Sequence, residues 1–163
     1  MKSDTPQLTI RAAKTSDASM ILHFIEELAD YEQLREQVTA DVSTLSFWLF
    51  DKKTAEAIIL EATGEPIGFA LFFYNFSTFL GKAGIYLEDL YLLPEHRNMG
   101  YGSQVLAYLA KLALSRNCGR LEFSCLDWNK SALACYHKAK AEALNGWTTY
   151  RICGDDLLRL AAE

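Results

Sequence analysis

The sequence predicts a mixed α/β fold, in which one central β-sheet carries helices on both faces. Short apolar runs typical of strands recur along the chain, and segments with helical spacing stand before and after the middle strands. This order favours helices on both faces of a single sheet. Half of the 163 residues are hydrophobic, so residues 1–163 suffice for a single domain with a sizeable core.

The N-terminal part of the chain predicts one strand and two helices. Residues 8–12 form a short strand-like run, and Ser16 and Asp17 then offer an N-cap for a helix. Apolar side chains recur at helical spacing over residues 20–28, which places this helix directly after the cap. Residues 43–50 predict a second, short helix with an aromatic face.

The middle of the chain predicts a hairpin, a further strand and a long helix. Residues 57–62 and 67–74 are strand-like, and the turn composition between them joins them into a hairpin. A loop over residues 76–82 leads into a strand over residues 84–93. The helix that follows, over residues 102–115, has one apolar stripe and therefore packs one face on the sheet.

The C-terminal part predicts three more strands and a helix. Residues 121–126 form a strand, and after a short break residues 131–138 form a helix. Residues 141–144 and 148–152 predict two closing strands around an Asn-Gly turn. The tail from Asp155 predicts a final helical turn.

Charge and composition exclude several classes of function. The net charge of −5 argues against a nucleic-acid partner, which requires a basic face. No apolar run approaches the roughly 20 residues of a membrane span, and the polar segment over residues 1–6 lacks a signal-peptide core. The four cysteines form no Cys-x-x-Cys pair, which favours free thiols in a reducing cytoplasm. No two of the three histidines have metal-ligand spacing, so no metal site is expected.

The segment from Tyr86 to Gln104 carries the strongest functional signal. A strand with the acids Glu88 and Asp89 is followed by a proline, a basic residue and a Gly-x-Gly turn that opens a helix. Backbone N–H groups at such a helix start bind phosphate oxygens. The residues after the last glycine fit neither a Walker A loop nor a dinucleotide fingerprint. The alternative interpretation is an ordinary strand–turn–helix joint.

The turn itself, Arg97-x-x-Gly100-x-Gly102, resembles the acyl-CoA signature of the GNAT acetyltransferases, Arg/Gln-x-x-Gly-x-Gly/Ala. The order of predicted elements is similar to this family over nearly the whole chain. The resemblance implies a GNAT-type mixed sheet of six to seven strands, with helices on both faces. It also implies acetyl-CoA as cosubstrate, without a metal.

Five further segments resemble the diamine acetyltransferase branch, which contains the spermidine/spermine acetyltransferases and thialysine-acetylating enzymes. These segments are Tyr31-Glu32, Tyr86 to Asp89, Leu126 to Asn129, Tyr136 and Gly146-Trp147. Two positions depart from the family pattern. Lys140-Ala141 stands where the family usually has Gly-Ala, and the loop Phe76 to Phe79 lacks the acid of the polyamine-acetylating members. That loop is similar to the thialysine type.

The resemblance implies a role for individual residues. The residues implied in binding acetyl-CoA are Leu90, Tyr91, Leu92, Arg97, Asn98, Met99, Gly100, Tyr101, Gly102, Ser103, Asn129 and Ser131. The residues implied in binding the amine are Tyr31, Glu32, Glu88, Glu122, Phe123, Ser124 and Trp147. Tyr136 is implied beside the thioester sulfur. The family often forms homodimers, which implies a homodimer here.

Acetyl transfer to an amine requires a base and benefits from an acid. A primary amine with a pKa of about 10.4 is neutral in only about one molecule in 10³ at pH 7. Glu88 is the predicted base and Tyr136 the predicted acid. Strand alternation predicts that Glu88 and Asp89 point to opposite faces, so that only one serves. The alternatives are a solvated strand position for Glu88 and core packing for Tyr136.

The predicted function is therefore an acetyl-CoA-dependent N-acetyltransferase acting on a small amine such as thialysine, a lysine analogue or a polyamine. Two other functions fit the same residues. One is acetylation of protein or peptide amines, which requires an open acceptor groove. The other is a non-catalytic acyl-CoA-binding module, because a fold alone does not specify activity.

Overall fold

A five-stranded mixed β-sheet forms the centre of the molecule in this computed structural model, which describes residues 6–163. The sheet keeps the order of the sequence, and its first four strands are antiparallel, whereas β5 runs parallel to β4. The strands are β1 (Leu8–Ala12), β2 (Glu56–Ala62), β3 (Glu65–Ser77), β4 (Lys82–Leu92) and β5 (Leu121–Phe123). Most of the polar N-terminal segment, residues 1–5, lies outside the described part.

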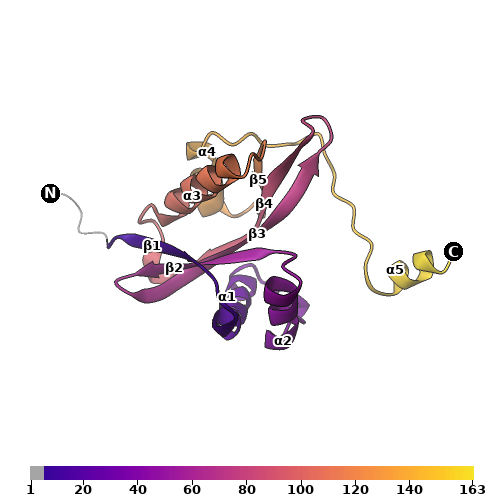
Figure 1. Cartoon of the computed structure of the whole chain (residues 1–163), viewed down its shortest axis with the longest axis horizontal. Helices are drawn as coiled ribbons and strands as arrows, with labels where there is room; N and C mark the ends of the chain where they lie inside the picture. Colours follow the sequence, from indigo (N-terminus) through magenta and orange to yellow (C-terminus); the bar gives the residue numbers. More distant parts are fainter. Residues whose placement is uncertain (1–5) are drawn as a thin grey trace.

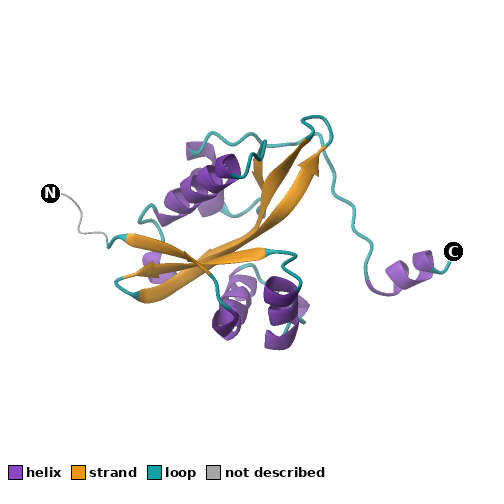
Figure 2. Ribbon diagram, viewed as in Figure 1, coloured by secondary structure: helices purple, strands orange, loops and turns teal. Residues whose placement is uncertain are grey.

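Helices cover both faces of this sheet, as predicted (Figures 1 and 2). The helices α1 and α2, from the N-terminal part of the chain, lie on one face of the sheet. The helices α3 and α4 lie on the other face. The helices are α1 (Ala18–Tyr31), α2 (Val42–Ser46), α3 (Tyr101–Ser115), α4 (Lys130–Lys138) and α5 (Gly154–Ala161). Four short turns complete the order: η1 (Thr15–Asp17), η2 (Arg35–Gln37), η3 (Phe47–Asp51) and η4 (Pro94–His96).

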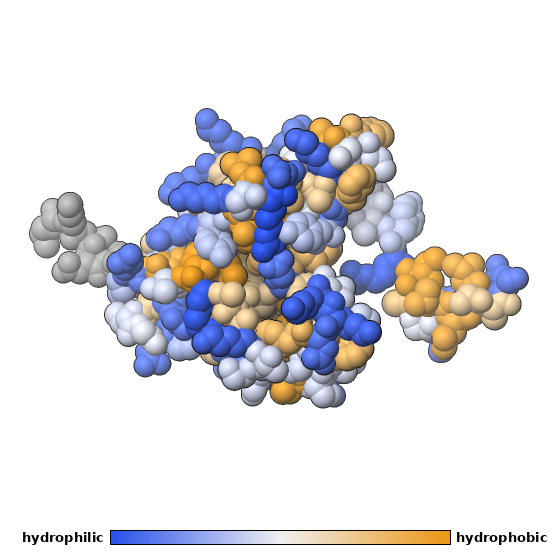
Figure 3. Space-filling view, viewed as in Figure 1, coloured by the Kyte–Doolittle hydropathy of each residue, from blue (hydrophilic) through white to orange (hydrophobic). Residues whose placement is uncertain are grey.

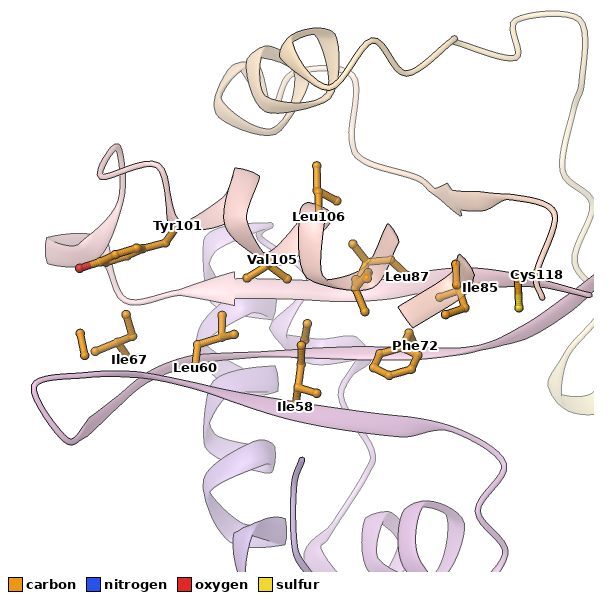
Figure 4. Packing of buried hydrophobic residues seen from close by; sticks show 14 residues of the cluster. Ile58, Leu60, Ile67, Phe72, Ile85, Leu87, Tyr101, Val105, Leu106 and Cys118 are labelled. Carbon is orange, nitrogen blue, oxygen red and sulfur yellow. The ribbon is translucent and has the colours of Figure 1, made fainter. Parts of the chain in front are cut away.

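The alternation of side chains along β2 divides the core between the two faces. Ile58 and Leu60 pack with α3, whereas Ile59 between them packs with α1. All three are almost fully buried, since continuous apolar runs suit strands that are covered on both faces. Figure 4 shows the α3 side of the core, where the stripe of α3 meets β2, β3 and β4. The predicted apolar stripe of this helix is confirmed.

Gly68 stands where β3 passes closest to the backbone of β4. A Cβ atom at this position would lie 2.1 Å from the carbonyl oxygen of Tyr91, so β3 and β4 would have to separate. We expect Gly68→Ala to lower the free energy of unfolding by at least about 2 kcal/mol, as overpacking does. Urea denaturation measures this change.

Gly102→Ala is the matched control for this prediction. A Cβ there meets only the Cys135 sulfur at 3.5 Å, an ordinary contact. We expect its stability to stay within about 0.5 kcal/mol of the unmodified protein. Equal stability of the two variants would contradict the close approach at Gly68.

The sheet has five strands, so the expectation of six to seven is wrong. The two closing strands predicted over residues 141–144 and 148–152 do not form. Their backbone has no strand beside it within the described chain, and a strand requires a hydrogen-bonded neighbour. β5 ends at Phe123, three residues earlier than predicted, where its pairing with Leu87 of β4 is the last one.

The chain after α4 leaves the body of the molecule as an extended arm, residues 142–163. It ends in α5, which stands apart from the sheet (Figure 1). Every residue of this C-terminal arm is exposed. The helical tail predicted from Asp155 is confirmed as α5, but it covers no face of the sheet.

Candidate active site

The turn between β4 and α3 presents backbone amides at the start of a long helix. Gly100 caps α3 in the left-handed conformation at φ +82°, which glycine adopts without strain. No side chain caps the helix, so the N–H groups of its first turn are free to bind an anion. Gly102 lies beside Cys135 of α4 in this turn.

A cavity opens directly beside this turn. It lies between β4, the end of β5, the end of α1 and the start of α4. Residues 87–92 form its strand wall, and Arg97 and Gly102 form the side toward the turn. The first turn of α3 therefore lies at the same cavity as the acids Glu88 and Asp89 and the phenol of Tyr136.

Tyr136 projects into the cavity from α4. Its ring packs on Phe123, with the ring centroids 4.1 Å apart. Burial raises the pKa of the Tyr136 phenol to about 12. The phenol is therefore fully protonated at neutral pH, in the form that donates a proton.

Two neighbouring acids of β4 line the same cavity. In the pairing of β3 with β4, Leu71 faces Asp89 and Phe72 faces Leu87, so Glu88 is the extra residue of a β-bulge. The bulge breaks the alternation of the strand, and the expectation that Glu88 and Asp89 serve opposite faces is wrong. Both residues line one cavity.

The acids differ in their surroundings. Glu88 is exposed, whereas Asp89 is half-buried at the cavity wall. Burial, together with the negative charges of Glu88 and Glu32, raises the pKa of Asp89 to about 7. Burial also raises the pKa of Glu32, which reaches the cavity from the end of α1. Three acids thus lie together on one wall, where a bound cation would relieve their mutual repulsion.

Tyr31 connects α1 to the opposite side of the cavity. Its hydroxyl donates to the Asn129 side chain at 3.4 Å, and its ring lies 5.6 Å from that of Trp128. The Arg97 guanidinium lies over the Tyr31 ring at 4.6 Å, while its Nε donates to the carbonyl of Leu92 at 2.9 Å. These contacts hold the turn, α1 and the start of α4 around one cavity.

The residues predicted to bind acetyl-CoA divide into two groups. Those that line the cavity are Leu90, Tyr91, Leu92, Arg97, Gly102, Asn129 and Ser131. Those that lie in the adjacent turn and helix start, outside the cavity lining, are Asn98, Met99, Gly100, Tyr101 and Ser103. The Tyr101 side chain is buried in the core and donates to the carbonyl of Pro6, so only its backbone faces the turn.

The residues predicted to bind the amine are also divided. Tyr31, Glu32, Glu88 and Ser124 line the cavity. The ring of Phe123 packs against the ring of Tyr136. Glu122 of β5 forms an ion pair with Arg120, which precedes the strand. Trp147 lies in the C-terminal arm, 81 % exposed, and does not line this cavity.

The cavity is also lined by residues to which the sequence analysis assigned no role in the site. They are Leu28, Leu87, Asp89, Cys125, Ala132 and Cys135. Cys135 stands four residues after Ser131 on α4, and this spacing places both side chains on one helix face. This helical spacing was sufficient to predict that Cys135 lies in the same site as Ser131. Cys125 follows β5 in irregular backbone, where no periodic pattern indicates which way a side chain points.

Three general features accompany the site. Within residues 6–163, no group of three or more His, Cys, Asp or Glu side chains is arranged to hold a metal ion. The four cysteines are free thiols. In the described chain, no helix is both long and apolar enough to cross a membrane.

Comparison with known proteins matches the chain to the Acetyltransferase (GNAT) family over residues 21–140. The thialysine N-epsilon-acetyltransferase of Bos taurus is 37 % identical over 166 residues, which cover 94 % of this chain and 97 % of that protein. The spermidine/spermine N(1)-acetyltransferase-like protein 1 of Homo sapiens is 28 % identical, over 94 % of this chain and 24 % of its own length.

Among solved structures, an integron cassette protein of V. cholerae matches 96 % of this chain and 98 % of its own, with a TM-score of 0.78. Its sequence identity is 22 %, so this likeness supports the fold alone. The family match and the thialysine relative confirm the predicted resemblance. The chain therefore belongs to the GNAT acetyltransferase family and is an acetyltransferase similar to the spermidine/spermine branch.

Proposed function

We propose that residues 1–163 form one catalytic domain that moves an acetyl group from acetyl-CoA to a primary amine of a small molecule. The observation that carries this proposal is a single cavity lined by Tyr136, Glu88 and the start of α3. Proton-handling groups and an anion-binding helix start are the two parts that amine acetylation with a phosphorylated carrier requires.

The residues present fit coenzyme A. The free amides of the α3 turn suit a diphosphate, and Arg97 adds a positive charge beside them. The strand wall of Leu90 to Leu92 offers backbone groups to an amide-containing arm. When bound, acetyl-CoA supplies an activated acetyl thioester.

Glu88 is the proposed base, and it removes the proton that blocks the amine lone pair. Tyr136 is the proposed acid, and its raised pKa keeps the phenol protonated, so that its O–H is available to the sulfur as negative charge develops there in the transition state. A thiolate whose thiol has a pKa of about 8.5 leaves without obligatory help, so Tyr136 accelerates the step rather than enabling it.

Asp89 is a second candidate for the base. Its carboxyl faces the same cavity, and its pKa of about 7 lies near the working pH, where a general base is most effective. Substitution of each acid in turn therefore distinguishes the two candidate bases.

The proposed acceptor is a thialysine-, lysine-analogue- or polyamine-like amine. Glu32, Glu88 and Asp89 line one acidic wall of the cavity, which suits a cationic amine. The name of the Bos taurus relative points to the same class of substrate. The proposal includes a homodimer and a cytoplasmic location, without nucleic-acid or membrane partners.

A panel of free amines and basic peptides, assayed by release of CoA from acetyl-CoA, tests the function. We expect turnover with lysine analogues and diamines, and little with peptides. Turnover with peptides alone would favour a protein acetyltransferase. Binding of CoA without turnover on any amine would favour a binding module, and a folded sample without affinity for CoA would refute the proposal.

A further inference from the structure

Tyr31 differs from the aromatic side chains of the C-terminal arm. Trp147 and Tyr150 of the arm are 81 % and 88 % exposed, and the apolar side of α5 in the same arm forms a separate hydrophobic surface (Figure 3). Tyr31, at the end of α1, is only 36 % exposed and lines the cavity. Its side chain contacts both the turn after β4 and the loop before α4. Tyr31 therefore links three segments that surround the cavity.

The Tyr31 ring is one of two aromatic rings that contact Arg97. The guanidinium carbon of Arg97 lies 4.6 Å from the centroid of the Tyr31 ring and 5.3 Å from that of Tyr91. The Arg97 Nε donates to the carbonyl of Leu92 at 2.9 Å, so the terminal amino groups are the donors that remain for an anion. Two aromatic rings and one hydrogen bond thus fix the direction of this charge.

The hydroxyl group of Tyr31 holds a second side chain, that of Asn129. The Asn129 Oδ1 accepts from the backbone N–H of Ala132 at 3.1 Å, which caps α4, and from the Tyr31 hydroxyl at 3.4 Å. Both bonds use the oxygen, so the amide nitrogen remains as the donor for a ligand. Tyr31 therefore contacts Arg97 and Asn129, two polar side chains that the resemblance assigns to acetyl-CoA.

We propose that Tyr31 is a positioning residue for the acyl carrier, which holds the donor groups of Arg97 and Asn129 in place, and that it is not a ligand of the amine. This role rests on the proposed function, in which the carrier is acetyl-CoA. It differs from the resemblance, which implies that Tyr31 binds the amine. The hydroxyl of Tyr31 is directed to Asn129 and its ring to Arg97 and Trp128, so both parts of the side chain are engaged before a substrate binds.

Recognition of the amine is left to the acidic side chains of the cavity. Glu32 follows Tyr31 directly, and Glu88 and Asp89 lie on the strand wall. A cationic ammonium group bonds to a carboxylate more strongly than to a neutral phenol. Loss of the Tyr31 side chain is therefore expected to lower the affinity for the carrier, which Arg97 contacts, and to change the KM of the amine little.

Calorimetric titration with CoA tests this role. We expect Tyr31→Leu to weaken the affinity for CoA about five- to thirtyfold, the range of a partly desolvated cation–π contact. Tyr31→Phe keeps the ring and loses one long hydrogen bond, so we expect a loss of only about two- to threefold. At saturating acetyl-CoA, the KM of the best amine is expected to stay within about twofold for both variants.

Tyr74→Leu is the matched control for Tyr31→Leu. Tyr74 of β3 also lies against an arginine, because the Arg116 guanidinium is 5.6 Å from its ring and Arg116 Nη1 donates to its hydroxyl at 2.9 Å. Tyr74 does not line the cavity. We expect Tyr74→Leu to bind CoA as the unmodified protein does. An equal loss of CoA affinity in the two leucine variants would indicate a general effect on the fold and would overturn the role.

A double-mutant cycle shows whether Tyr31 acts through Arg97. In an Arg97→Gln background, we expect Tyr31→Leu to weaken the affinity for CoA by less than about threefold, because the group that the ring holds is gone. The same loss in both backgrounds would overturn the role. A raised KM for the amine with an unchanged affinity for CoA would also overturn it and would return Tyr31 to the amine site.

The unmodified protein separates this role from the proposed function. If it binds CoA and acetylates amines, and Tyr31→Leu binds CoA equally well, only the role of Tyr31 is refuted. If the folded, unmodified protein does not bind CoA, the proposed function is refuted and the role of Tyr31 with it.

Discussion

Replacement of Tyr136 by Phe is expected to lower kcat by about 10²–10⁴, the usual contribution of a positioned proton donor. The change removes one hydroxyl group, and the ring keeps its packing on Phe123. The fold and the affinity for CoA are therefore expected to stay unchanged. Steady-state kinetics with the best amine, together with calorimetry for CoA, measure both quantities.

Tyr108→Phe is the matched control for this experiment. Tyr108 is also a partly buried tyrosine, and it packs against the α3 side of the core away from the catalytic cavity. We expect its kcat to equal that of the unmodified enzyme. A kcat for Tyr136→Phe within a factor of about three of the unmodified value would remove Tyr136 from the mechanism.

The second large effect is expected at the paired acids of β4. Glu88→Gln removes the proposed base and is expected to lower kcat by about 10²–10⁴, because the amine must then lose its proton to water. Asp89→Asn keeps Glu88 and is expected to lower kcat by less than about tenfold. A larger loss of kcat for Asp89→Asn than for Glu88→Gln would identify Asp89 as the base.

Stability measurements at two pH values report on Asp89 independently of activity. The folded protein raises the pKa of this carboxyl to about 7, so between about pH 4 and pH 7 the folded state binds more protons than the unfolded state. Its contribution to stability therefore falls as the pH rises through this window. We expect Asp89→Asn to be more stable than the unmodified protein at pH 8, with a difference that shrinks toward pH 4.

Urea unfolding at both pH values measures this difference. Asp30→Asn is the control, since Asp30 is exposed at the end of α1, and it is expected to lack the same pH-dependent gain. A stability difference between Asp89→Asn and the unmodified protein that is the same at pH 4 and pH 8 would contradict the buried position of this acid. A gain in stability with a loss of activity is the usual sign of a strained catalytic group.

The sequence predicted most elements because their signals are local. The helix start at Gly100 to Gly102 is a property of a few adjacent residues, and so is the hairpin between β2 and β3. The apolar stripes of α1 and α3 repeat every three to four residues and predict which faces are covered.

The features that the sequence did not predict depend on distant partners. The bulge at Glu88 arises from the register of β3 against β4, which no single strand encodes. The closing strands were predicted from propensity, yet propensity forms no strand without a neighbour. The contact of Tyr31 with Asn129 joins residues 98 positions apart, so its geometry is visible only in the fold.

That long-range contact has a consequence for the order in which the enzyme matures. Most of the proposed carrier-binding side is continuous in sequence, because β4, the turn and α3 span only residues 82–115. The acceptor side requires α1 to meet the loop before α4, and closing so long a loop is a late and slow event during folding. We therefore expect a newly synthesised chain to form the proposed site for the acyl donor before it completes the proposed site for the amine.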